Sequence, residues 1–167
     1  HSRVRRQRQM CIRDRIDACL SIDKEDDLAL SVKKSSALME FIKTSDGSNL
    51  IQGFKRANKI LLQAEKNDGV EYSFGADLKY AKEDAELNLF SVLDNEEVKI
   101  RTSLEREDFV EAMNSMANLR APIDSFFETV QINSDVDHIR RNRLNLLSRI
   151  CKLCLSVADL TLSLIHI

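Results

Sequence analysis

Residues 119–160, LRAPIDSFFETVQINSDVDHIRRNRLNLLSRICKLCLSVADL, decide the fold. At about 100° per residue, the part from 136 to 160 separates into a broad apolar arc and an opposite polar arc. The apolar arc holds Leu153, Leu146, Ile139, Val157, Ile150, Cys154, Leu147 and Ala158. The polar arc holds Arg141, Asn145, Ser148, Lys152 and Asp159. We therefore expect a long, mostly buried helix over 136–160, about 37 Å in length, that starts near Ser134.

The rest of the chain shows the same helical spacing. One proline and four glycines in 167 residues leave few helix breakers, and Pro122 sits where the first turn of a helix accepts it. Further helices are expected over 26–43, from Ser48 or Asn49 to about 66, over 78–102 and over 107–118. Five or six helices with short connections make an antiparallel bundle, so the predicted fold class is all-α.

The predicted helix over 78–102 carries many acidic residues. We expect these carboxylates to face solvent, where they would repel a phosphate backbone. They are Glu83, Asp84, Glu86, Glu96 and Glu97. Phe126 and Phe127, in contrast, are expected to fill much of the core near the end of the chain.

Three arginines stand close together near the start of the last helix. Arg140, Arg141 and Asn142 are expected to form an outward edge that either contacts RNA or is an ordinary solvated charge run. Arg143 projects into the apolar arc instead. Because a buried arginine needs a partner, we expect Asp124 or Glu128 to pair with it.

Two upstream features allow similar alternatives. Lys55, Arg56 and Lys59 lie on one predicted helix, where they either touch RNA backbone or form a solvated face. The segment 67–77 has Gly69 and Gly75 around two aromatic residues and is expected to be a loop. Its rings, Tyr72 and Phe74, either stack on unpaired bases or fix the loop to the core.

Motifs for catalysis are absent from the sequence. There is no glycine-rich phosphate loop and no Ser/His/Asp arrangement, so we expect no catalytic site. Cys151 and Cys154 form a CxxC, but both lie in the apolar arc and no further ligands accompany them, so packing is favoured over a metal. With no run of about 18 to 20 apolar residues and no signal peptide pattern, we expect a cytoplasmic protein with no membrane partner.

The order of several segments resembles one family. LRAPIDSFFETVQIN, then IRRNRLNLLSRI and VADL, is similar to the C-terminal end of the bacterial glycyl-tRNA synthetase beta subunit. SDGSNLIQGFKRANKILLQAEK is similar to the segment directly upstream in that subunit. The resemblance covers roughly residues 16 to 162 and implies a DALR-type anticodon-binding domain, like that of arginyl-tRNA synthetases.

The resemblance also implies a function and partners. The domain would bind the anticodon stem-loop of glycine tRNA as part of glycine-tRNA ligase, with no cofactor of its own. ATP would be used at a separate alpha subunit, and the parent enzyme would be an alpha2 beta2 tetramer. The implied RNA-binding residues are Lys55, Arg56, Lys59, Arg120, Arg140, Arg141, Asn142 and Arg143. Among them Arg140, Arg141, Lys55 and Arg56 would hold phosphates, and Asn142, Arg143 or Arg120 would lie nearer the bases.

The two ends of the chain differ in character from its middle. HSRVRRQRQMCIRDR and SLIHI resemble translated sequencing-adaptor sequence, so we expect 1–15 and 163–167 to be non-native, or 1–15 to be disordered. Without residues 1–15, which hold six arginines and one aspartate, the chain has 19 basic and 26 acidic residues. Such an acidic domain binds tRNA only through local basic patches.

We expect two native parts. Residues 16–66 would be upstream helices, and 67–162 would be the terminal anticodon-binding bundle. The competing class is a non-catalytic structural or protein-interaction bundle, in which the basic residues dock on another subunit or form internal ion pairs.

Overall fold

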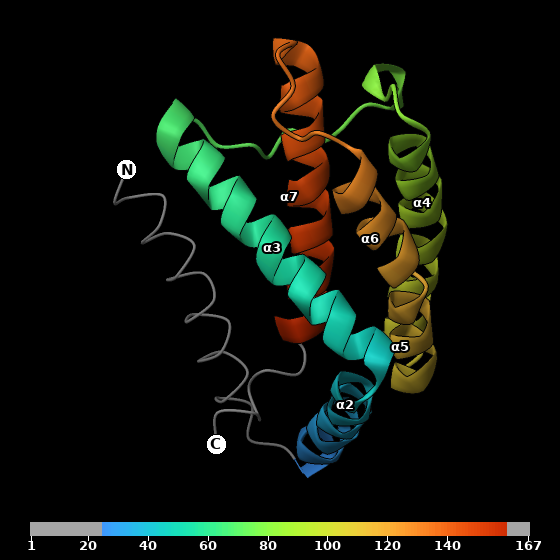
Figure 1. Cartoon of the computed structure of the whole chain (residues 1–167). Helices are drawn as coiled ribbons and strands as arrows, with labels where there is room; N and C mark the ends of the chain where they lie inside the picture. The colour runs from blue at the N-terminus through green and yellow to red at the C-terminus, as the bar shows by residue number, and fades with distance from the viewer. Residues whose placement is uncertain (1–24, 160–167) are drawn as a thin grey trace.

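The computed structural model of the chain describes residues 25–159, which form six α-helices and one short 3-10 helix (Figure 1). The elements are α2 (Glu25–Lys43), α3 (Ser45–Asp68), η1 (Leu78–Tyr80), α4 (Asp84–Glu105), α5 (Phe109–Ala117), α6 (Arg120–Thr129) and α7 (Asp137–Asp159). No strand occurs in this range, so the all-α bundle is confirmed. The predicted non-native ends lie outside the described residues, and the predicted division near residue 66 stays a prediction.

The C-terminal helix α7 lies at the centre of the bundle. It packs against α3, while α6 packs against both α3 and α4 (Figure 1). The apolar arc expected from the sequence is buried at Leu146, Leu147 and Ile150. One hydrophobic core runs from α2 to α7 and includes residues of every α-helix in between. No helix in the described part of the chain is long and apolar enough to cross a membrane.

Helix α3 begins earlier than expected. Thr44 is its N-cap, and the Thr44 hydroxyl accepts a hydrogen bond of 3.0 Å from the N–H of Gly47. Ser48 and Asn49, the expected start of this helix, therefore lie inside it. Threonine, like serine and asparagine, is a favoured N-cap residue. At its other end, α3 stops at Gly69, whose φ of 68° is left-handed.

The start of α4 also differs from the expectation. Leu78–Tyr80 is a separate 3-10 turn, and α4 begins at Asp84. A capping box defines this start. The Glu83 side chain accepts a hydrogen bond from the backbone N–H of Glu86, and the Glu86 side chain accepts one from the backbone N–H of Glu83. Glu86 is consequently fully buried and Glu96 is 7% exposed, so the expectation that both face solvent is wrong.

The loop between α3 and η1 crosses α7 (Figure 1). The backbone N–H of Asp77 donates to Asn142 Oδ1 at 2.7 Å, and Lys152 Nζ donates to the carbonyl of Ser73 at 3.3 Å. Asn145 and Ser148 lie between these two anchors on the same arc of α7 and are buried. Their expected place on an outward polar arc is therefore wrong, because that arc is only partly open to solvent.

The two aromatic residues of this loop have different environments. Tyr72 is 5% exposed, and its hydroxyl donates to Asp68 Oδ2 at 2.6 Å. Phe74 is 94% exposed. One ring thus fixes the loop to the core, whereas the other lies almost wholly in solvent.

Candidate nucleic-acid interface

The three predicted cations of α3 lie on the surface. Lys55, Arg56 and Lys59 are all exposed, and Lys55 and Lys59 are one turn apart on the same face. Neither lysine forms an ion pair with another residue of the described range. The guanidinium of Arg56 lies 4.7 Å from the ring centre of Phe127 on α6. This part of α3 therefore presents two exposed charges, unpaired within the described range, beside a guanidinium plane held by an aromatic ring.

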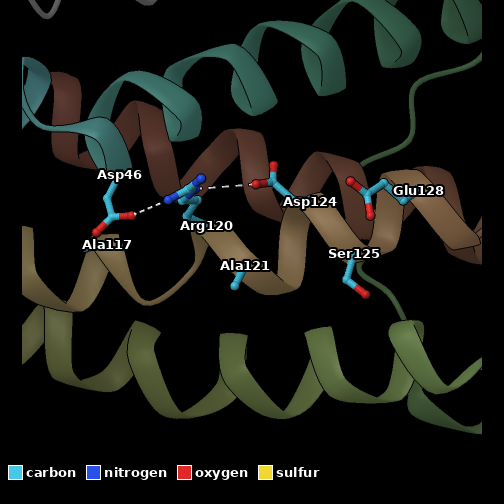
Figure 2. A pocket seen from close by; sticks show the side chains of 7 residues that line it. All are labelled: Asp46, Ala117, Arg120, Ala121, Asp124, Ser125 and Glu128. Carbon is cyan, nitrogen blue, oxygen red and sulfur yellow. Dashed lines mark hydrogen bonds and ion pairs between the residues drawn. The ribbon is translucent and has the colours of Figure 1, made fainter.

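Arg120 lies in an open pocket of about 300 Å³ between the start of α3 and the α5–α6 junction (Figure 2). It reaches Asp46 Oδ1 at 2.7 Å and Asp124 Oδ2 at 3.5 Å. Glu128 lines the same pocket. Because two carboxylates pair with the guanidinium and a third lines the pocket, the pocket repels phosphate. Arg120 instead joins α6 to α3.

Arg140 faces the C-terminal end of α3. Its guanidinium lies 2.8 Å from Asp68 Oδ2, and it also donates to Asn133 Oδ1 at 2.7 Å and to the Tyr72 hydroxyl at 3.2 Å. The hydrogen bond from Tyr72, followed by that from Arg140, holds the pKa of Asp68 below its usual value. Arg140 therefore joins α7 to the end of α3 and to the loop that follows, which uses most of its donors.

Asn142 and Arg143 are both buried, at 5% and 5% exposed. The expectation that Asn142 belongs to an outward edge is wrong, since its side chain receives the loop at Asp77. Arg143 is internal, as expected, but its partner is Glu86 at 2.7 Å and not Asp124 or Glu128. The guanidinium also donates to the carbonyl of Gln131. These two side chains support the fold, and neither presents a surface to a ligand in this structure.

Arg141 differs from its neighbours on both sides. One residue after Arg140 is about 100° further round the helix, so Arg141 turns away from α3 towards the face that the loop crosses. Its side chain is exposed and forms no ion pair within residues 25–159. Of the four predicted contact residues on α7, Arg141 is the one with a guanidinium open to a partner.

The structure therefore does not bring the predicted residues into one cluster. Arg56 precedes Asp68, the partner of Arg140, by 12 positions on α3, which corresponds to about 18 Å along the helix. That separation exceeds the screening length of about 8 Å at physiological salt. The cations of α3 and those of α7 thus form two separate patches.

The two cysteines of the CxxC sequence are packing residues. Both are buried, and burial, followed by the charge of neighbouring Cys151, raises the pKa of Cys154 to about 12. No group of three or more metal-binding side chains occurs in the part of the chain that the structure describes. The Cys154 thiol is therefore held in its unreactive form at neutral pH.

Several known proteins similar to this chain are glycine-tRNA ligase beta subunits. The chain is 59% identical to the glycine-tRNA ligase beta subunit of Ruegeria sp. over 148 residues, which are 89% of this chain and 22% of that protein. It is 60% identical to the beta subunit of Cereibacter sphaeroides over 148 residues, which are 89% of this chain and 21% of that protein. The corresponding subunit of Rhodospirillum centenum is 40% identical over 147 residues, which are 87% and 21% of the two chains.

The chain spans about a fifth of the length of these curated relatives. A family match covers most of the chain, from residue 50 to residue 163, and thus includes α7, the loop over it and most of α3. The chain therefore belongs to the DALR anticodon binding domain family.

Proposed function

We propose that the chain is the tRNA-binding part of a glycine-tRNA ligase beta subunit and holds the anticodon stem-loop of glycine tRNA. The observation that carries this proposal is the 59% to 60% identity to such beta subunits over 148 residues. The family match to an anticodon binding domain also supports tRNA binding. In the whole enzyme, a cytoplasmic alpha2 beta2 tetramer, this part would bind tRNA while the alpha subunit uses ATP to attach glycine.

The exposed cations give the proposal its contacts. Lys55, Arg56 and Lys59 on α3 and Arg141 on α7 would hold phosphates, because their charged groups reach solvent. Such contacts orient an RNA without reading its sequence. Arg120, Arg140, Asn142 and Arg143 would act indirectly, since their contacts within the protein fix the helices that carry the exposed cations.

Charge removal on α3 tests the phosphate contacts. The double variant Lys55→Gln, Lys59→Gln should bind glycine tRNA more weakly, and each lost contact should lower the slope of log affinity against log salt by about 0.7 to 0.9. Fluorescence anisotropy with labelled glycine tRNA over a salt series measures both quantities. The double variant should unfold like the parent chain, because both side chains are exposed.

Lys99→Gln is the matched control. Lys99 is a well-exposed lysine on α4, where it pairs with Glu96 at 3.4 Å on the acidic side of the bundle. Its replacement should leave the salt slope unchanged. A double variant on α3 that keeps the parent affinity and slope would favour the competing protein-interaction bundle.

A further inference from the structure

Phe74 is the most exposed large hydrophobic residue in the described part of the chain, at 94%. Single exposed apolar side chains are common on proteins, so exposure alone decides nothing. What distinguishes Phe74 is that the loop beneath it is held on both sides. The ring therefore stands at a defined place on the surface.

The anchors precede and follow the ring. Before it, the N–H of Tyr72 donates to Glu65 Oε1 at 3.1 Å, and the carbonyl of Ser73 accepts from Lys152 on α7. After it, the N–H of Asp77 donates to Asn142 at 2.7 Å. Between these anchors Gly75 adopts a φ of 87°, where an added Cβ would meet no atom within 4 Å. The glycine is thus required by the backbone turn and not by a lack of space.

The face of α7 that this loop crosses combines rings and cations. At about 100° per residue, His138, Arg141 and Lys152 fall within one arc of the helix. The ring of His138 lies 5.4 Å from the ring of Tyr80 in η1. We call this surface, made of Phe74, Tyr80, His138, Arg141 and Lys152, the loop face.

The charges on the loop face favour an anion. Lys79 lies over Tyr80 at 4.7 Å but is paired with Asp77 at 3.4 Å, so it adds little net charge. Arg141 has no carboxylate partner among residues 25–159. The ammonium group of Lys152 has three donors and gives one to Ser73. Two cations with free donors therefore accompany the exposed ring.

A flat ring beside free cations suits unpaired nucleotides. Every base has a π-face that can stack on an aromatic side chain, and the adjoining phosphates need cationic donors. In paired RNA the bases are already stacked on one another, so only loops and single strands offer such a face. The loop face would not distinguish one base from another by hydrogen bonds. It would distinguish unpaired nucleotides from paired ones.

We propose that Phe74 stacks on an unpaired base of the bound RNA, and that Arg141 and Lys152, about 16 Å apart along α7, hold different phosphates of the same unpaired segment. This proposal rests on the proposed function, because it takes the RNA to be the anticodon loop. It adds an aromatic residue, Phe74, to the exposed cations already named on α7. It also explains why the fold holds an aromatic ring in water at the point where the loop crosses α7.

Phe74→Ala tests the stacking. It should weaken binding of the glycine tRNA anticodon stem-loop by roughly 5- to 150-fold, the range measured for loss of one base stack. The salt slope should stay unchanged, since no charge is removed. Phe74→Tyr should bind like the parent chain. A stem of the same sequence closed without unpaired bases should bind Phe74→Ala and the parent chain equally.

A fluorescent base separates stacking from a general loss of affinity. With 2-aminopurine at successive positions of the anticodon loop, the parent chain at saturation should quench one position, and Phe74→Ala at saturation should not. Equal affinity of Phe74→Ala and the parent chain, with weakened binding by Lys55→Gln, Lys59→Gln, would overturn the stacking proposal and leave the proposed function intact. No binding of the stem-loop by the parent chain would overturn both.

Discussion

Glu86→Gln should lower the free energy of unfolding by about 3 to 5 kcal/mol, the usual cost of removing one member of a buried ion pair. Glu86 is fully buried and Arg143 is 6% exposed at its side chain, with 2.7 Å between the two charged groups. Glutamine keeps an oxygen for the N–H of Glu83 in the capping box. The variant therefore removes the charge alone and leaves the Arg143 guanidinium without a counter-ion. Urea denaturation followed by circular dichroism measures the change.

A second substitution should reverse most of that loss. In Glu86→Gln, Arg143→Met both charges are gone, and buried ion pairs can often be replaced by apolar residues at little cost. Glu86 Oε2 and Arg143 Nε have no hydrogen-bond partner among the described residues, so the pair itself is incompletely satisfied. Glu97→Gln is the matched control on the same helix. Its partner Arg149 is 23% exposed and also pairs with Asp94, so the cost should stay below about 1 kcal/mol.

The second large effect is expected at Phe126. Phe126→Ala should cost about 3 to 5 kcal/mol, because its ring is fully buried where α6 packs against α3 and α4. The cavity left by the ring cannot close without moving one of these helices. The same denaturation measurement applies, and the unfolding transition should remain cooperative.

The neighbouring Phe127 provides the comparison. Its ring meets Phe126 edge-on at 5.8 Å but is only partly buried, with the Arg56 guanidinium over its outer face. Phe127→Ala should cost roughly 1 to 2 kcal/mol, since part of this surface is already in water. Equal costs at the two positions would contradict the packing described for α6.

Periodicity predicted the inner face of α7 well. The spacing of Leu146, Leu147 and Ile150 is a local property, and all three are buried. The polar arc was predicted less well, because Asn145 and Ser148 are buried and a loop that lies about 70 residues earlier in the chain binds the same side of α7 at Asn142 and Lys152. No local pattern reports such a contact between distant segments.

The wrong position expected for Glu86 and the wrong partner expected for Arg143 have one cause. In α4, the spacing that places Leu89 and Leu93 in the core also places Glu86 there. Because Glu86 is charged, it was expected to face solvent, and Asp124 or Glu128 was expected to pair with Arg143 instead. The Glu83 and Glu86 capping box was the signal that could have corrected this, since a capping side chain turns back towards the helix start.

The candidate site was predictable as a set of residue types but not as a surface. Arg140, Arg141 and Arg143 fall within four consecutive positions, yet one faces Asp68, one faces solvent and one is buried against Glu86. Helical rotation alone separates Arg140 from Arg141, whereas the choice of partners depends on tertiary packing. Likewise, the sequence could not say which aromatic ring of the loop would be buried and which exposed.

Recognition of the anticodon is the central claim, and an anticodon replacement tests it most directly. The affinity of this chain should be measured for glycine tRNA and for the same tRNA with another triplet in place of its anticodon, at one fixed salt concentration. We expect the replacement to weaken binding by about tenfold or more, which corresponds to about 1.4 kcal/mol. Equal affinity for the two tRNAs, or no binding of either, would contradict the claim.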